Sequence, residues 1–336
     1  MSNIHCGKDL TSGVIDALGF CAFTVTDDNV ARLYPELTKN AYVIPAGEAS
    51  KTPETLFAVL AEMSNRRIKR GDRIAAVGGG VVGDLTGLAA ALYMRGVEWT
   101  SIPTSLLAMV DSGIGGKTAV DFNGIKNLVG AFHMPRDIVI SCEFLKTLPE
   151  REWLCGTGEL IKTCLLSKDA YALLTDKLDG FIARDDDSVF ALVDECVKIK
   201  NAVVESDPEE KNLRKILNVG HTVGHALESA DRYKLSHGEY VLKGMLTELA
   251  MCRDLTDEAF YDEITRLLVG FTAPPRTTGK SVCEKALSDK KNTGDTITIM
   301  LPRAAGDILD VKIERADFMR RYDDALKELK RVWTSL

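Results

Sequence analysis

Three of the five histidines lie close together in the sequence, and their spacing is typical of metal ligands. His221 and His225 are four residues apart in the stretch NVGHTVGHALE, so a helix would place both side chains on one face. The zinc-protease motif is excluded, because Thr222 stands where that motif requires a general-base glutamate. With His237 and one carboxylate from elsewhere, the pair would form an open zinc site. The alternative is a pair of hydrogen-bonded histidines with a purely structural role.

A glycine-rich turn follows one expected strand and leads into an expected helix. The strand covers residues 73–77, the turn GGGVVGD runs from Gly78 to Asp84, and the helix covers 85–93. Glycines let a backbone approach a pyrophosphate, and a helix N-terminus offers free N–H groups and a positive dipole end. The turn follows the third expected strand and no acid ends the next one, so Asp27 and Glu48 are the candidates for a ribose. The alternative is a glycine turn made for close packing.

Several basic side chains could hold an anionic ligand. Gly-Gly-Lys-Thr at 115–118 resembles the end of a Walker A loop, but Asp111 replaces the first glycine that a nucleoside triphosphatase requires. Lys117 therefore remains as an anion donor, and Lys126 and Asn127 add two more. In helical stretches of the second half, Lys162 follows Glu159 by one turn and Arg214 precedes Asn218 by one turn. Lys198 and Lys200 are candidates to point into a site, and the alternative for each is a solvated helix face.

The pattern of elements changes near residue 150. Before it, strand-like runs alternate with helical ones, which predicts an α/β domain over 1–149 with a mostly parallel, Rossmann-like sheet. After it, amphipathic helical stretches dominate over 150–336, with a small hairpin near 296–311. We expect a nucleotide-binding domain and a mainly helical domain carrying metal and anion ligands, with the site in a cleft between them.

The bulk composition excludes several classes of protein. The net charge of −7 argues against a general nucleic-acid binder, although a local basic pocket is compatible with it. The eight cysteines form no C-x-x-C pair, so reduced thiols are expected rather than disulfides. The sequence shows no signal-peptide core and no uncharged apolar run of the ~18 residues that a membrane span needs. These features predict a soluble, cytoplasmic protein.

The motifs, taken in order, resemble those of the 3-dehydroquinate synthase family over nearly the whole chain. The motifs that carry the resemblance are GGGVVGD at 78–84, IPTSLLAMVDSGIGGKTAVDFNGIKN at 102–127, GELIK at 158–162, NVGHTVGHALE at 218–228, SHGE at 236–239 and DKKN at 289–292. Together these are far more specific than any one of them.

The resemblance implies roles for individual residues. The divalent metal, zinc or cobalt, would be held by Glu159, His221 and His237, and His225 would face the substrate phosphate. The positions that correspond to NAD-binding residues are Asp27, Asn29, Glu48, Lys51, Gly79, Gly80, Val81, Asp84, Thr104, Ser105, Leu107, Asp111, Lys126 and Thr147. The positions that correspond to substrate-binding residues are Lys117, Asn127, Lys162, Lys200, Arg214, Leu217, Asn218, His225 and either Lys290 or Lys291, with Arg95 reaching in from a neighbouring subunit of a homodimer.

The resemblance also implies a reaction. The substrate would be 3-deoxy-D-arabino-heptulosonate 7-phosphate, whose carboxylate and phosphate explain why an acidic protein would gather basic residues. Transient oxidation by NAD, phosphate elimination, reduction and intramolecular aldol closure would give 3-dehydroquinate. The alternatives are another sugar phosphate cyclase, a metal-dependent polyol dehydrogenase and a catalytically inactive binding subunit. The presence of Lys200, Arg214 and Lys290, which would bind a carboxylate, favours the synthase over the other cyclases. The dense set of phosphate and carboxylate donors argues against the dehydrogenase, and the retention of every expected polar group argues against the inactive subunit.

Overall fold

The chain forms two compact units. Unit 1 comprises residues 1–149 and 179–209, and unit 2 comprises 150–178 and 210–336. The computed structural model describes residues 2–208, 213–287 and 295–334. The chain therefore passes between the units three times, and a helix from the second half of the sequence completes the first unit.

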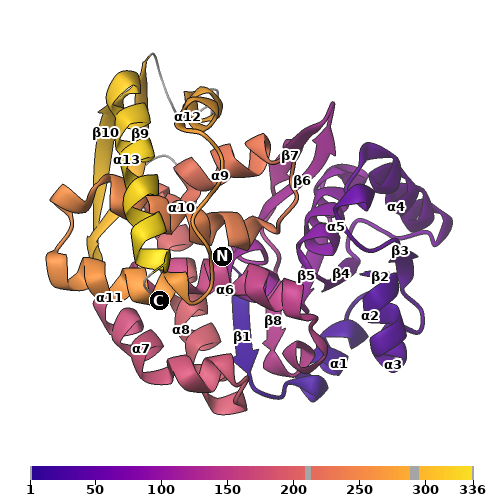
Figure 1. Ribbon diagram of the computed structural model, residues 1–336. Coiled ribbons are helices and arrows are strands. Elements are labelled where there is room, and N and C mark those ends of the chain that lie inside the picture. Colours follow the sequence, from indigo (N-terminus) through magenta and orange to yellow (C-terminus); the bar gives the residue numbers. More distant parts are fainter. Residues whose placement is uncertain (1, 209–212, 288–294, 335–336) are drawn as a thin grey trace. The chain divides into compact units, whose positions relative to one another are not determined.

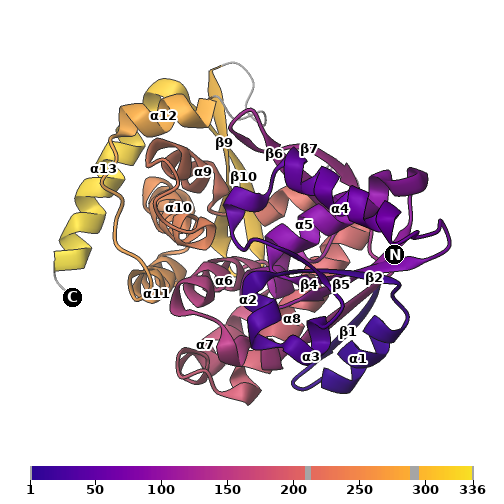
Figure 2. The ribbon, with the colours of Figure 1, turned by 90° about the vertical axis from the view of Figure 1, so that its right-hand side faces the viewer.

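Unit 1 is built on a six-stranded sheet in the order β1-β8-β5-β4-β2-β3, and every neighbouring pair is parallel (Figures 1 and 2). Parallel neighbours require crossover connections, which explains the alternation of strands and helices in the sequence. The strands are β1 (Asn3–Gly7), β2 (Phe23–Asp27), β3 (Tyr42–Ile44), β4 (Arg73–Gly78), β5 (Glu98–Pro103) and β8 (Asp137–Ser141). The predicted parallel α/β architecture is confirmed.

Six α-helices accompany this sheet: α1 (Thr11–Gly19), α2 (Asp28–Leu33), α3 (Pro35–Thr38), α4 (Pro53–Asn65), α5 (Gly80–Leu92) and α8 (Asp186–Ser206). Helix α4 begins as its sequence predicts, since Thr52 accepts a hydrogen bond from the backbone N–H of Thr55 and Pro53 is the first helical residue. Helix α5 follows β4 and precedes β5 in the chain, and its side chains Val82, Leu85 and Leu88 belong to the hydrophobic core. Its burial fixes the glycine turn that precedes it.

Unit 1 also differs from the sequence-based expectation at several places. The glycine turn follows the fourth strand, because β1 precedes the first strand that the pattern indicated, and α5 begins at Gly80 rather than at residue 85. The helix expected at 106–110 includes a π-helical turn at Ala108–Ser112. An antiparallel hairpin of β6 (Lys117–Phe122) and β7 (Ile125–Phe132) occupies a stretch for which no element was predicted.

Unit 2 is mainly helical, as predicted. Helix α10 (His237–Met251) lies at its centre and packs against α6 (Glu150–Cys164), α9 (His221–Ala230), α11 (Glu258–Val269) and α13 (Arg315–Thr334). Helix α7 (Lys168–Ile182), helix α12 (Gly279–Leu287) and the hairpin of β9 (Thr296–Ala304) and β10 (Asp307–Glu314) complete it. The C-terminal helix and the hairpin were both predicted.

One predicted helix of unit 2 is broken. The stretch from Leu213 to Ala230 forms a 3-10 helix over Leu213–Asn218 and then α9, with Gly220 between them in the left-handed region at φ 74°. A residue with a side chain is strained at such a φ, so glycine favours the break here. Because of the break, His221 is the first residue of a helix rather than a position within one.

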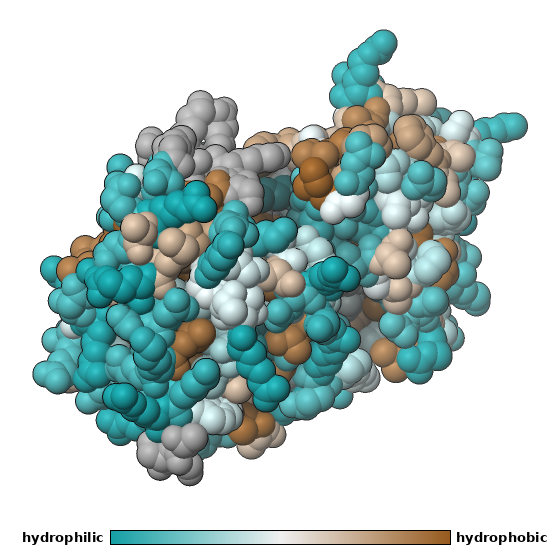
Figure 3. All heavy atoms as spheres, turned by 45° about the horizontal axis from the view of Figure 1, so that its top comes forward, coloured by the Kyte–Doolittle hydropathy of each residue, from teal (hydrophilic) through white to brown (hydrophobic). Residues whose placement is uncertain are grey.

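No helix within the described residues is long and apolar enough to cross a membrane. The face of the molecule seen in Figure 3 is mainly hydrophilic, with apolar side chains scattered over it. Short 3-10 turns connect the elements at Glu48–Ser50, Tyr93–Arg95, Cys142–Thr147 and Arg253–Leu255.

Candidate active site

A buried carboxylate in unit 2 is surrounded by imidazoles. Glu159 on α6 is fully buried, and its Oε1 lies 3.4 Å from Nε2 of His221 and 3.2 Å from Nε2 of His237. Neither carboxylate oxygen receives a well-aligned hydrogen bond from the described residues. Two nitrogen ligands and one oxygen ligand, from three helices, thus converge on one point. This donor set suits a divalent metal such as zinc.

The far side of each imidazole is held by an acceptor. Nδ1 of His221 lies 3.0 Å from the carbonyl oxygen of Val219, and Nδ1 of His237 lies 3.2 Å from Oε2 of Glu228. A neutral imidazole that donates through Nδ1 presents the lone pair of Nε2 to a metal. Both rings are therefore oriented so that Nε2 faces Glu159.

The cluster also shifts the pKa values of its members. Burial alone would raise the pKa of Glu159, but Lys162 and His221 hold it well below its usual range. Burial lowers the pKa of His221 well below its usual range. Burial would also lower the pKa of His237, but Glu159 and Glu228 outweigh it and raise that pKa to about 10. In the metal-free chain His237 is therefore the imidazole that carries the extra proton.

The third histidine of the motif completes the cluster. Ligand atoms of His221, His225 and His237 all lie within 4.8 Å of one another, and the ring centroids of His221 and His225 are 5.0 Å apart. The first sequence hypothesis, with His221 and His225 on one helix face, is therefore geometrically sound. The ligand set implied by the resemblance has Glu159 in place of His225, and it shares His221 and His237 with the first hypothesis.

Close backbone contact between α6 and α10 brings Glu159 to His237. A Cβ added to Gly238 would lie 1.8 Å from the carbonyl oxygen of Cys155, and one added to Gly158 would lie 2.3 Å from the carbonyl oxygen of Gly238. Only glycines allow this approach, because the opposing atoms are backbone. The glycines beside Glu159 and His237 in the motifs GELIK and SHGE thus have a mechanical role.

Of the substrate-binding residues predicted in unit 2, Lys162 contacts this cluster, and Arg214, Leu217 and Asn218 lie in the 3-10 helix that precedes α9. Lys162 is almost fully buried and forms an ion pair with Glu159 one turn earlier on α6. Arg214 and Leu217 are buried in the 3-10 helix, and the side-chain amide of Asn218 donates to the carbonyl oxygen of Lys215 at 3.1 Å. Lys290 and Lys291 lie outside the described residues.

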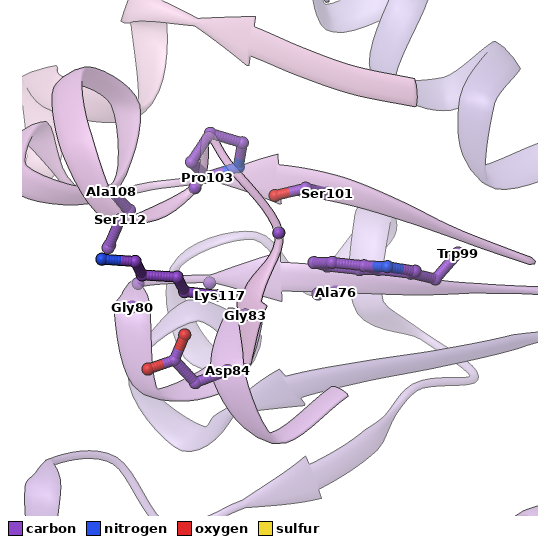
Figure 4. A pocket seen from close by; sticks show the side chains of 14 residues that line it. Ala76, Gly80, Gly83, Asp84, Trp99, Ser101, Pro103, Ala108, Ser112 and Lys117 are labelled. Carbon is purple, nitrogen blue, oxygen red and sulfur yellow. The ribbon is translucent and has the colours of Figure 1, made fainter. Parts of the chain in front are cut away.

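In unit 1, the glycine turn lines a small pocket with residues of β5, the π-helical turn and β6 (Figure 4). A Cβ on Gly79 would lie 3.3 Å from Oγ of Ser105, and one on Gly80 would lie 3.0 Å from Oγ of Ser112. Asp84 and Lys117 also line the pocket. Helix α5 begins in this turn with no side-chain cap, so its first N–H groups face a hollow that glycines keep open.

Two ion pairs fix charged residues of unit 1. Nζ of Lys51 lies 2.5 Å from Oδ2 of Asp84, and both side chains are largely buried. Burial raises the pKa of Asp84 to about 6, although Lys51 opposes the rise. Lys200 on α8 forms an ion pair with Asp111 in the π-helical turn. The structure thus joins Asp111, predicted to bind NAD, to Lys200, predicted to bind substrate.

The remaining predicted residues of unit 1 have mixed surroundings. Asp27 caps α2 by accepting from the backbone N–H of Val30 at 2.9 Å, and Nζ of Lys126 lies 3.8 Å from Oε1 of Glu48. The hydroxyl of Thr147 lies 2.8 Å from that of Tyr34. For the other predicted positions the structure gives the location but no contact that indicates a ligand: Asn29 on α2, Val81 on α5, Thr104, Ser105 and Leu107 between β5 and the π-helical turn, and Asn127 on β7. Arg95 is exposed.

The sequence reasoning missed two buried carboxylates. Glu228 lies in the quoted motif but was given no role, although it contacts His237. Glu248 on α10 was not singled out, although its carboxylate accepts hydrogen bonds from the backbone of Gly220 and Val223. A glutamate in a run of apolar helical residues, as at Glu248, is the sequence signal that could have drawn attention to it.

Comparisons with known proteins show the family to which the chain belongs. Residues 41–155 match the family model of the 3-dehydroquinate synthase N-terminal domain, and residues 156–292 match that of the C-terminal domain. The chain belongs to the 3-dehydroquinate synthase family. It is 39% identical to the 3-dehydroquinate synthase of Clostridium acetobutylicum, covering 86% of each chain. It is 34% identical to that of Alkaliphilus metalliredigens, covering 95% of each chain.

Solved structures of the family's relatives share the fold. The 2-epi-5-epi-valiolone synthase of Streptomyces hygroscopicus, solved with NAD+ and Zn2+ bound, superposes with a TM-score of 0.85 at 28% identity, covering 99% of this chain and 97% of its own. A probable glycerol dehydrogenase of Sinorhizobium meliloti superposes with a TM-score of 0.64 at 15% identity, covering 100% of this chain and 97% of its own, which shows the fold alone.

Replacing Gly238 by alanine should destabilise unit 2. The new Cβ meets the carbonyl oxygen of Cys155, so α6 and α10 must separate, at a cost of about 1–3 kcal/mol or more. The free energy of unfolding in urea measures this. The matched control is Gly19→Ala at the end of α1, where a Cβ meets nothing within 4 Å and stability should change by less than about 0.5 kcal/mol. Equal urea midpoints for the two variants would contradict this account of the contact.

The stability of the protein in EDTA should fall as the pH rises from about 6.5 to about 10. His237 has a pKa of about 10 when folded and an ordinary value of 6.5 otherwise, so between these two values the folded state holds a proton that the unfolded state has lost. This stabilisation is full below pH 6.5 and disappears as the pH passes 10. Thermal melting at pH 6.5 and 9.5 measures the effect. Cysteines and other groups also titrate here, so the decisive comparison is His237→Asn, which should show a smaller fall. An unchanged fall would assign the pH dependence to other groups.

Proposed function

We propose that the chain is a 3-dehydroquinate synthase, an enzyme that converts 3-deoxy-D-arabino-heptulosonate 7-phosphate into 3-dehydroquinate and phosphate. The observation that carries this proposal is the match of both halves of the chain to one family, together with the buried Glu159, His221 and His237 cluster at the family's motif positions. Full-length relatives of that name at 33–39% identity support the same reaction.

A divalent metal fits the cluster of Glu159, His221 and His237. The buried carboxylate lacks a well-aligned hydrogen bond from the described residues, and both Nε2 atoms face it, which is the arrangement that a cation would complete. A metal bound there supplies Lewis-acid activation of a substrate oxygen. The relative solved with Zn2+ bound supports zinc, and a cyclase solved with Co2+ makes cobalt a reasonable probe.

NAD fits the glycine turn of unit 1. The small pocket lined by Gly79 and Gly80 and the uncapped start of α5 suit a pyrophosphate, and NAD supplies a transient hydride acceptor when bound there. The Lys51–Asp84 ion pair fixes both side chains beside that turn. We assign unit 1 the cofactor and unit 2 the metal.

The basic residues bind and orient the two anionic ends of the substrate. Lys162 and Lys200 are buried and each forms an ion pair with a carboxylate, so their charges are held in place before any ligand arrives. Arg214 is buried in unit 2, and Lys117 is exposed at the start of β6. Such fixed donors hold a flexible sugar acid in one pose, which lowers the entropy cost of ring closure.

Two other functions are less well supported. Another sugar phosphate cyclase is the closer rival, because the valiolone synthase shares the fold, but at 28% its identity lies below the 33–39% of the 3-dehydroquinate synthases. A polyol dehydrogenase is a weaker rival. A probable glycerol dehydrogenase shares the fold at 15% identity, and an uncharged polyol does not require the buried cationic side chains that this chain has.

Phosphate release tests the function directly. Metal-loaded protein with the heptulosonate phosphate and NAD should release phosphate without accumulating NADH, and omitting NAD or adding EDTA should abolish the release. Release from sedoheptulose 7-phosphate alone would instead support the other cyclase. NADH accumulation without phosphate would support the dehydrogenase.

We also propose that the chain is a homodimer that pairs through the β6–β7 hairpin. Five apolar side chains of the hairpin are exposed: Phe122, Ile125, Leu128, Val129 and Phe132. Among the described residues β7 pairs only with β6, so its other edge is open to a second copy. Arg95 is exposed on the same unit, which is compatible with its predicted reach into the partner's site.

Val129→Glu should dissociate the dimer, because two copies would then bring like charges together on an apolar edge. Light scattering should show a monomer, with activity lowered at least tenfold through the loss of Arg95 from the partner. The control is Phe20→Glu, which changes a residue that is 74% exposed at the end of α1 and should leave the dimer intact. A dimeric Val129→Glu variant would rule out this hairpin as the interface, and a monomeric wild type would rule out the dimer.

A further inference from the structure

The two histidines of the proposed metal site share a structural feature: each is the first residue of its helix. The N-terminal N–H groups of a helix need acceptors from outside the helix. Helix α10, which begins at His237, has its own capping box, in which Ser236 and Glu239 exchange hydrogen bonds. Helix α9, which begins at His221, has glycine at the capping position and no side-chain cap.

A carboxylate from α10 takes the place of the missing cap. Oε2 of Glu248 accepts from the backbone N–H of Gly220 at 3.0 Å, and Oε1 accepts from that of Val223 at 2.8 Å. Glu248 is 1% exposed, and no cation of the described residues forms an ion pair with it. Burial raises its pKa to about 8, against the effect of these backbone hydrogen bonds. A buried acid without a cation is costly, which suggests that its contacts have a use.

The same place is where α9 and α10 come closest. A Cβ on Gly244 would lie 1.8 Å from the carbonyl oxygen of Gly220, and one on Gly220 would lie 2.8 Å from the carbonyl oxygen of Val241. The backbones are therefore in direct contact, and the two hydrogen bonds of Glu248 cross that contact. They fix the turn from Gly220 to Val223 against α10.

The orientation of His221 depends on this turn. Its Nδ1 is held by the carbonyl oxygen of Val219, a backbone atom next to Gly220, and its Nε2 faces Glu159. We propose that Glu248 is a positioning residue, which holds the start of α9 so that His221 presents Nε2 to the metal. The inference rests on the metal assignment of the proposed function. It assigns Glu248 no contact with substrate or metal.

Cobalt binding to the folded protein tests the inference without relying on turnover. Chelator-treated wild type, Glu248→Gln and Glu248→Ala would be titrated with Co2+ and followed by its visible absorption. Loss of a group that orients a metal ligand typically costs about 10–100-fold in affinity. Glu248→Ala should show a loss in this range, and Glu248→Gln a smaller one, because its amide oxygen can still accept one of the two hydrogen bonds.

The matched control is Asp257→Ala, which removes the side-chain cap of another helix of unit 2. Asp257 accepts from the backbone N–H of Phe260 at 3.0 Å at the start of α11, so its loss should lower stability by about 1 kcal/mol. Its cobalt affinity should equal that of the wild type. This comparison separates positioning from a general loss of stability.

Three results would overturn the inference. Wild-type cobalt affinity in folded Glu248→Ala would show that Glu248 only stabilises the fold. If that variant does not fold, wild-type affinity in Glu248→Gln, with both stabilities measured, would lead to the same conclusion. A wild-type chain that binds no cobalt would overturn the metal assignment together with the inference. If only a Glu248 variant gives the contrary result, phosphate release by the wild type would show that the proposed reaction still holds.

Discussion

The burial of one carboxylate constrains much of unit 2. Glu159 is removed from water, and an ionised carboxylate in such surroundings is stable only with cationic or metal partners. Lys162 satisfies part of this need from the same helix, while His221 and His237 must come from two others. Helix α10 accordingly meets both α6 and the start of α9 with the backbones in contact. The glycines at those contacts follow from the position of this carboxylate.

Buried charges in unit 1 are also paired with opposite charges. Its buried Lys51 and Lys200 are paired with Asp84 and Asp111, beside the glycine turn and in the π-helical turn. Each pair holds a cation in place without adding net charge. This explains how a chain with a net charge of −7 carries the basic groups that an anionic substrate requires.

The features that the sequence predicts well are those set by local pattern. The alternation of strands and helices predicted the parallel sheet, and the spacing of His221, His225 and His237 predicted their cluster. Glu159 entered only through the resemblance, since nothing local connects α6 to α9. The π-helical turn, the β6–β7 hairpin and the break at Gly220 were missed.

These misses have a common physical cause. Gly220 lies in a stretch that has helical periodicity on both sides, and only its left-handed φ and the close approach of α10 reveal the break. The apolar run around Glu248 could indicate its burial, but it does not identify the backbone groups of Gly220 and Val223 as its partners, of which Gly220 is 28 residues away. Tertiary hydrogen bonds of this kind leave no periodic trace in the sequence.

The assignment of α8 to unit 1 has a consequence for how the chain is made. Residues 1–149 contain the whole parallel sheet, yet α8, which packs on the π-helical turn and carries the partner of Asp111, is translated after α6 and α7. The first unit is therefore unfinished when its last strand leaves the ribosome, and it waits for residues up to 209. The surface of the π-helical turn on which α8 packs has no α8 in that interval, so synthesis of the second unit begins before the first unit is complete.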